Sequence, residues 1–154
     1  MFGPDWLLDA AIMMIERTHR AVNLETDELA AMLAGPEPPL LFDIRTAEEY
    51  EKSHIATAVR LDPDTGADDF SARYGSLLAE REIVFYCSVG QRSSELLDRV
   101  ESVCVKARAK SSRNLRGGIF RWYNEGKPVV DASGLTNDIH EFDPIWGMMV
   151  ERRR

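Results

Sequence analysis

The fold is decided by one stretch of sequence, Ile83-Val84-Phe85-Tyr86-Cys87-Ser88-Val89-Gly90-Gln91-Arg92-Ser93. Its first four residues are apolar, β-branched or aromatic, a composition typical of a strand that is buried on both faces. From Arg92 to Ala109 the apolar residues recur at the spacing of one helix face. The stretch therefore predicts a buried strand, a tight loop and a long helix, with a thiol at the point where the strand ends.

The rest of the chain repeats this alternation. A helix is expected through Leu33 with Thr26 as its N-cap, and a short helix is expected to follow Thr46 as its N-cap. Alternation of this kind predicts an α/β fold, with a mostly parallel sheet, helices on both faces and right-handed crossovers. Further strands are predicted at 21–24, 40–44, 58–61 and 114–115, and further helices at 68–80 and 119–124.

Three parts of the chain are distinguished by their composition. Residues 1–20 are expected to form an extra N-terminal helix that begins near Pro4 and carries a wide apolar stripe. Such a stripe packs either on the domain or on a second copy, so a monomer and a homodimer are both open. Residues 21–130 form the predicted domain. Residues 131–154 are expected to be a C-terminal tail that packs on the domain or extends from it.

Composition limits the class of protein. The chain has 154 residues, of which 44% are hydrophobic and 29% charged, enough for one core without a metal or disulfide. Its net charge of −7 disfavours nucleic acid and anionic membrane surfaces as partners. The two cysteines fit a reducing compartment, and neither a signal-peptide pattern nor a membrane-length apolar run is present. The expected location is the cytoplasm.

The predicted loop carries the candidate chemistry. Cys87 falls at the carboxyl edge of the sheet, where parallel α/β proteins bind their ligands. A loop that feeds a helix start turns backbone N–H groups inward, and the helix dipole adds partial positive charge. Both effects favour the thiolate, which is the nucleophilic form. Gly90 permits the backbone angles of such a loop, and Arg92 offers a guanidinium suited to an oxyanion such as thiosulfate.

The segment from Tyr86 to Ser94 resembles the active-site loop of the rhodanese family. Two other segments match in order, and the resemblance covers roughly residues 24–130. The departures are Ser53 and Thr57, which stand where the family usually has glycine. The matching segments are Asp43-Ile44-Arg45 with Glu49-Tyr50 and His54-Ile55, similar to D-(I/V)-R…E-(F/Y)…G-H-I, and Leu115-Arg116-Gly117-Gly118…Trp122…Gly126-Lys127-Pro128, similar to L-x-G-G…W…G-x-P.

The resemblance implies a five-stranded sheet and a sulfurtransferase reaction. Cys87 would attack the outer sulfur of a donor such as thiosulfate, and a thiophilic acceptor would remove that sulfur from the resulting persulfide. No metal or organic cofactor is implied. Since Arg92 is the one cation of the loop, a protein-bound persulfide or thiol carrier is an alternative partner to a small donor. The terminal sulfur would be held by the loop residues Ser88, Val89, Gly90, Gln91 and Ser93.

Some residues have two readings. Asp43, at the end of a predicted strand, either orients the loop through its N–H groups or Arg92, or serves as a structural helix-entry residue. Arg45 is predicted to pair with Glu49, four residues further on. Cys104 shares a helix face with apolar residues and is expected to lie in the core.

Two other functions compete with sulfur transfer. Phosphatases and arsenate reductases on this fold resemble C-x5-R, whereas Cys87 to Arg92 is C-x4-R, and Tyr86 replaces the histidine that usually precedes a phosphatase cysteine. Many rhodanese-like domains only bind partners and have lost the cysteine. Because Cys87 is present, catalysis is preferred over a non-catalytic binding or regulatory module.

Overall fold

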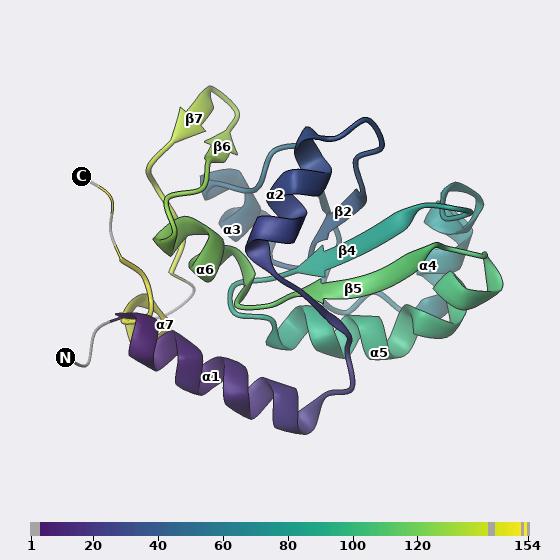
Figure 1. Ribbon diagram of the computed structural model, residues 1–154, viewed down its shortest axis with the longest axis horizontal. Helices are drawn as coiled ribbons and strands as arrows, with labels where there is room; N and C mark the ends of the chain where they lie inside the picture. Colours follow the sequence, from purple (N-terminus) through teal and green to yellow (C-terminus); the bar gives the residue numbers. More distant parts are fainter. Residues whose placement is uncertain (1–3, 142–143, 152, 154) are drawn as a thin grey trace.

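The computed structural model describes residues 4–141, 144–151 and 153. Its centre is a five-stranded sheet in the order β1-β5-β4-β2-β3, in which all four pairings are parallel (Figure 1). This confirms the predicted α/β class and the number of strands in the sheet. The strands are β1 (Asn23–Leu24), β2 (Leu40–Asp43), β3 (Val59–Arg60), β4 (Glu82–Tyr86) and β5 (Ser111–Leu115).

Helices cover both faces of the sheet, as the alternating pattern predicts. In β4, Val84 and Tyr86 face one layer of helices and Ile83 and Phe85 face the other, and all four are fully buried. This two-sided burial explains the continuous apolar run of the strand. The first layer contains α2 (Thr26–Ala34), α3 (Ala47–Lys52) and α6 (Gly118–Asn124), and the second contains α4 (Ala67–Tyr74), a 3-10 turn (Gly75–Leu77) and α5 (Gln91–Lys106) (Figure 1).

The N-caps of α3 and α2 were both predicted from the sequence, and the structure confirms one of them. Thr46 caps α3 as predicted, because its hydroxyl accepts from the Glu49 amide and the Glu49 carboxylate accepts from the Thr46 amide. The prediction for Thr26 is wrong. Glu25 occupies the N-cap position of α2, and Thr26 is already helical and donates its hydroxyl hydrogen to Glu125.

The helix predicted over 68–80 ends earlier than expected. The α-helical part stops at Tyr74, and a 3-10 turn through Gly75 and Ser76 follows. Glycine and serine are poor helix formers, so the last turn tightens instead of continuing.

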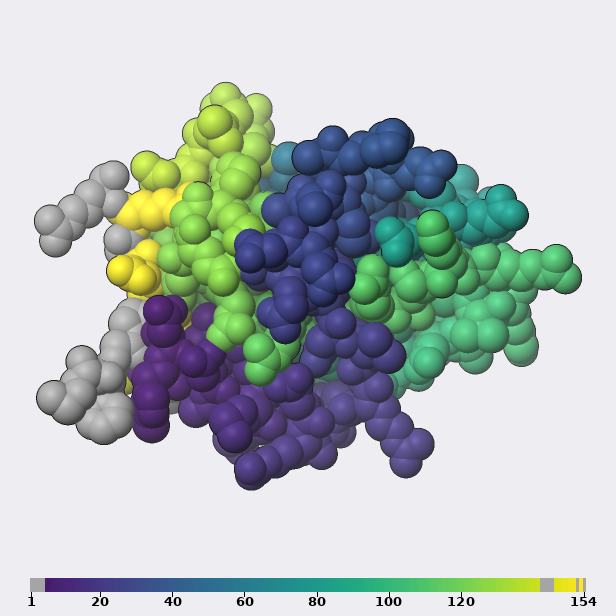
Figure 2. Space-filling view, in the orientation of Figure 1, coloured from purple at the N-terminus to yellow at the C-terminus, as the bar shows by residue number. Residues whose placement is uncertain are grey.

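The extra N-terminal helix, α1 (Pro4–Thr18), lies along one edge of the molecule, close to α6 (Figures 1 and 2). Leu8 and Ile12 are buried in the same cluster as the side chains of α6, and Glu16 pairs with Arg116 at 3.1 Å. One face of α1 therefore packs on the domain of its own chain, while Trp6, Met13 and Met14 remain exposed.

The chain after α6 forms a hairpin of β6 (Val129–Asp131) and β7 (Gly134–Thr136), followed by α7 (Pro144–Gly147). Val150 returns to the apolar cluster that holds Leu8 and Ile12. Within the described ranges, the chain contains no helix that is both long and apolar enough to cross a membrane.

Replacing Ile12 by alanine should lower the free energy of unfolding by about 2–4 kcal/mol, because a buried side chain is lost and a cavity remains. Met14, on the opposite face of α1, is 68% exposed, so Met14→Ala should change stability by no more than about 0.5 kcal/mol. Urea unfolding of the two variants measures both values. Equal, small effects would mean that α1 does not dock as described.

Candidate active site

The carboxyl ends of β2 and β4 meet at one edge of the sheet. Asp43 lies opposite Tyr86 in the β2–β4 register. The pairing continues for one more step, because the Ile44 amide donates to the Tyr86 carbonyl at 2.7 Å. Cys87 therefore leaves the sheet beside the turn that leads into α3, as the sequence predicts for a ligand site of a parallel sheet.

The backbone curls around the sulfur of Cys87. The Gly90 amide donates to Sγ at 3.2 Å, and the Ser93 amide donates to it at 3.5 Å. Gly90 adopts a φ of +114°, a conformation that side chains other than glycine rarely take. We call residues 87–93 the cysteine loop. The thiol side chain is fully buried, so these amides rather than water surround it.

A polar chain reaches the sulfur from the neighbouring strands. The Ser93 hydroxyl lies 3.4 Å from Cys87 Sγ and donates to Asn114 Oδ1 at 2.5 Å. Asn114 Nδ2 in turn donates to Asn23 Oδ1 at 3.0 Å. Sequence reasoning did not single out Asn114. The sequence signal that could have identified Asn114 is its polar side chain directly before Leu115, within a strand predicted from the sequence.

The start of α6 packs directly against the cysteine loop. The Ile119 and Phe120 amides donate to the carbonyls of Cys87 and Ser88 at 2.9 and 3.0 Å. At Gly118 a Cβ atom would lie 2.4 Å from the Ser88 carbonyl oxygen and 2.5 Å from that of Cys87. Glycine at this position is therefore a requirement of the loop itself.

The remaining loop side chains point in different directions. Val89 is buried in the apolar cluster that includes Leu8 of α1, and Ser88 is fully buried. Gln91, the first residue of α5, is exposed. The loop thus has a wholly buried base and one exposed polar side chain.

Arg92 lies differently from the position expected of an oxyanion ligand. Its guanidinium forms a bidentate pair with Glu49, with Nη1 donating to Oε1 at 2.7 Å and Nη2 to Oε2 at 3.0 Å. It also donates to the Ser88 hydroxyl at 2.9 Å, and that hydroxyl donates to Glu49 at 3.1 Å. Glu49, which the sequence presents as part of a family motif and as the expected partner of Arg45, binds both Arg92 and Ser88 in this cluster.

The environment of Glu49 favours its charged form. Burial raises the pKa of a carboxyl, but hydrogen bonds and charge from Arg92, with the Thr46 amide, outweigh it and lower the pKa of Glu49 to about 2. The carboxylate is fully buried, so the pair is shielded from solvent.

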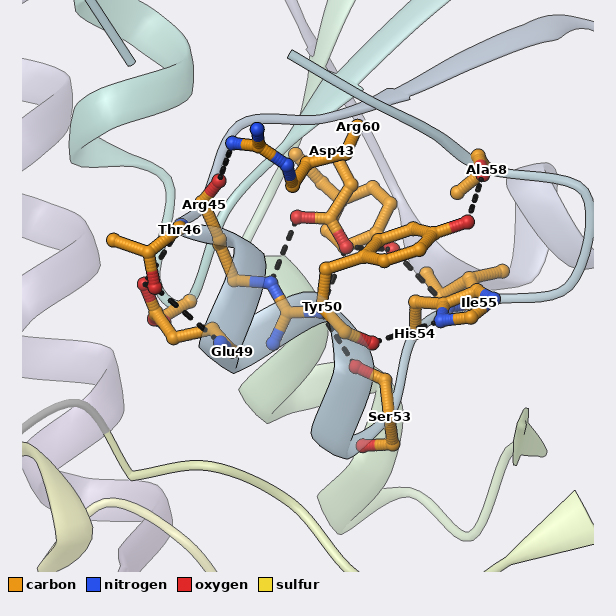
Figure 3. Close-up of polar contacts among 12 residues, drawn as sticks. Asp43, Arg45, Thr46, Glu49, Tyr50, Ser53, His54, Ile55, Ala58 and Arg60 are labelled. Carbon is orange, nitrogen blue, oxygen red and sulfur yellow. Dashed lines mark hydrogen bonds and ion pairs between the residues drawn. The ribbon is translucent and has the colours of Figure 1, made fainter. Parts of the chain in front are cut away.

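A second buried pair lies in the turn after β2 (Figure 3). Arg45 donates to both oxygens of Asp43, at 2.8 and 2.7 Å, and to the Ser53 carbonyl at 2.7 Å. The predicted pair of Arg45 with Glu49 is therefore wrong. Asp43 accepts from Nε and Nη2 of Arg45 and from the Tyr86 hydroxyl, the latter at 2.6 Å, and among the described contacts it binds neither the loop amides nor Arg92.

Tyr86 connects this pair to the next segment. Its hydroxyl accepts from the Ile55 amide at 3.0 Å while it donates to Asp43. Burial and the neighbouring Asp43 charge raise the pKa of Tyr86 well above its usual value, so the phenol stays protonated.

The structure places His54, from the first matched segment, and Cys104, the second cysteine, in structural surroundings. His54 stacks on Tyr50 with ring centroids 3.8 Å apart, and its Nδ1 lies 2.9 Å from the Tyr50 carbonyl (Figure 3). Cys104 is buried in the apolar cluster of α5, and burial raises the pKa of its thiol to about 11. The expectation that Cys104 is a core residue is confirmed. Among the described residues, no three His, Cys, Asp or Glu side chains gather as a metal site.

Comparison with known proteins agrees with this architecture. Residues 25–125 match the family model described as the rhodanese-like domain. The chain is 30% identical over 112 residues to a sulfurtransferase of Allochromatium vinosum, covering 73% of this chain and 97% of that protein. The chain belongs to the rhodanese-like domain family.

Solved structures share the fold. A rhodanese-like domain protein from Staphylococcus aureus superposes with a TM-score of 0.52 at 24% identity, covering 75% of this chain and 96% of that one. A Bacillus halodurans protein superposes with a TM-score of 0.57 at 22% identity, covering 82% and 87% of the two chains.

Glu49→Gln should make the contribution of the buried pair to stability measurable. Because the folded-state pKa is lowered, this contribution is complete above about pH 4.5 and is lost as the pH falls through about 2. We expect the variant to be less stable by about 3 kcal/mol at pH 7, with the difference shrinking across that window. Urea unfolding at several pH values tests this. Glu51→Gln, an exposed change on the same helix, should show no such trend.

Gly118→Ala should damage the cysteine loop, whereas Gly126→Ala should not. Both glycines have positive φ, so each change costs about 1–2 kcal/mol of backbone strain. Only at Gly118 does the new Cβ collide with the loop carbonyls, since nothing lies within 4 Å at Gly126. Thermal unfolding should show a small loss of stability in Gly126→Ala and a larger one in Gly118→Ala, and only Gly118→Ala should change the reactivity of Cys87 toward a thiol reagent. Equal behaviour of the two variants would contradict the close packing described.

Proposed function

We propose that this protein is a sulfurtransferase that carries sulfane sulfur as a persulfide on Cys87. The observation that supports the proposal is the pair of backbone amides, from Gly90 and Ser93, that face the Cys87 sulfur. Such donors stabilise a thiolate and equally a terminal persulfide sulfur. A sequence identity of 30% to a sulfurtransferase, over 97% of that protein, supports the same reaction.

The reaction proceeds in two displacements at sulfur. In the first, the Cys87 thiolate forms a bond to the outer sulfur of the donor, and the bond between the two donor sulfurs breaks. With thiosulfate, sulfite leaves with the electron pair of that bond. In the second, a thiophilic acceptor attacks the terminal sulfur, and Cys87 leaves as the thiolate that began the cycle.

Each part of the loop has a task in this scheme. The backbone between Ser88 and Ser93 encloses the transferred sulfur, with Gly90 supplying the turn. Gln91 is the exposed side chain that meets donor and acceptor. Arg92, bound to Glu49, holds the loop in place more than it binds an oxyanion. Asp43 fixes the turn after β2 through Arg45.

The partners follow from the same chemistry. A small sulfane donor such as thiosulfate, or a persulfide on a protein or thiol carrier, supplies the sulfur, and a thiol or other thiophile receives it. We propose a reducing, cytoplasmic setting, since an exchangeable persulfide depends on available thiols.

The persulfide is tested by mass spectrometry of the intact protein after treatment with thiosulfate or an organic thiosulfonate. We expect a gain of one sulfur atom, about 32 Da, that cyanide removes. Cys87→Ser should abolish the gain.

Cys104→Ser is the matched control, because its thiol is buried in the same apolar cluster as Cys87 but lies on α5, outside the cysteine loop. It should load sulfur like the unchanged protein. If no donor loads the unchanged protein, the non-catalytic binding module becomes the better explanation.

A further inference from the structure

We propose that Glu49 is a specificity-determining residue that directs the protein toward sulfur donors carrying a single negative charge, because it neutralises Arg92 beside the cysteine loop. The inference rests on the proposed persulfide chemistry and concerns which donor class enters that site.

The buried charges around the loop cancel in pairs. Glu49 binds Arg92 through two hydrogen bonds, and Asp43 binds Arg45 through two more. Glu49, Asp43 and Arg45 are all fully buried, so solvent does little to screen them. The cluster therefore adds two positive and two negative charges, with a net contribution near zero.

Arg92 is the cation that a donor at Cys87 would meet. Its guanidinium donates to the hydroxyl of Ser88, the residue that follows Cys87, at 2.9 Å, and Arg92 shares the first turn of α5 with Ser93. Glu49 accepts from both Nη1 and Nη2 of this guanidinium, and the Ser88 hydroxyl, which accepts from Arg92 and donates to Glu49, bridges the two side chains. A donor at the loop thus experiences the Arg92–Glu49 pair as a dipole and not as a full positive charge.

Two arginines within the matched segment from Leu115 to Pro128 are also compensated. Arg116 pairs with Glu16 and lies 3.8 Å from Glu25, and Arg121 pairs with Asp9. Both carboxylates that form the close pairs come from α1. The helix that packs beside the loop therefore removes two further positive charges from its surroundings.

This electrostatic arrangement distinguishes donors that deliver the same sulfur. Thiosulfate carries two negative charges and leaves as sulfite. Methanethiosulfonate carries one, because a methyl group replaces one oxygen, and leaves as methanesulfinate. Each donor loses its outer sulfur to the Cys87 thiolate, and total charge is conserved in both reactions. A full positive charge at the site attracts a dianion more strongly than a monoanion. Neutralising Arg92 therefore weakens the binding of thiosulfate more than the binding of methanethiosulfonate.

The test compares kcat/KM for thiosulfate and for methanethiosulfonate in each variant, with cyanide as the acceptor. Since the two donors differ in intrinsic reactivity, the informative quantity is the change in their ratio between variants. Glu49→Gln keeps a side chain that can cap α3, but it replaces one oxygen by an N–H donor that cannot bind Arg92. We expect the ratio to move toward thiosulfate by about tenfold, chiefly through KM.

Two controls separate charge from structure. Glu48→Gln removes one carboxylate from the same helix, but Glu48 is exposed and pairs with His140, so the ratio should stay unchanged. Adding Arg92→Gln to Glu49→Gln should return the ratio to that of the unchanged protein. If the role of Glu49 is purely structural, Glu49→Gln should lower kcat/KM for both donors by the same factor, and that result would overturn the proposal.

A second variant decides the matter if Glu49→Gln does not fold, as judged by near-ultraviolet circular dichroism. Gln91→Lys adds an uncompensated cation at the exposed start of α5 without touching the core. It should shift the ratio toward thiosulfate as well, and an unchanged ratio would count against the proposal. Absence of any Cys87 adduct in the unchanged protein would instead refute the persulfide chemistry itself.

Discussion

The close approach of Gly118 to the cysteine loop is the constraint on which the site depends. The first amides of a helix have no partner within that helix, and at α6 two of them bind the carbonyls of Cys87 and Ser88. A trans peptide points its carbonyl and the following N–H in opposite directions. Holding these carbonyls against α6 therefore turns the amides of Ser88 and Val89 away from it. The absence of a side chain at position 118 allows the backbones to meet.

Local helix capping and the site are linked through Glu49. The capping box with Thr46 is an ordinary device for starting a helix, yet the same carboxylate receives both donors of Arg92. A buried charge pair is stable when its geometry is good and further hydrogen bonds satisfy the remaining oxygens. Thr46 and Ser88 provide those bonds. The start of α3 thereby fixes the start of α5, although 43 residues separate Glu49 from Arg92.

Sequence reasoning succeeded where the signal is local. The apolar run of β4, the glycine in the loop and the spacing of α5 each follow from neighbouring residues, and the structure contains all three. Sequence reasoning failed where a polar side chain pairs with a residue that is distant in the sequence or lies outside the expected helix. Arg45 and Glu49 have helical spacing, but Arg45 lies before α3, so the spacing rule does not apply, and both side chains pair elsewhere. The prediction of Thr26 as an N-cap failed for a simpler reason: the helix begins one residue earlier than expected, so Glu25 takes the N-cap position.

The way in which the site compensates charge suits a carrier of sulfur. The thiolate and the persulfide anion each bear one negative charge, so the charge on Cys87 would be the same before and after loading. Backbone amides supply partial positive charge at fixed positions, at 3.2 and 3.5 Å from the sulfur, and they need no reorganisation as the terminal atom changes. A full cation in contact with the sulfur would also bind the departing sulfite. In the proposed reaction, with Arg92 bound to Glu49, the loop would stabilise the sulfur anion and leave the anionic product free to depart.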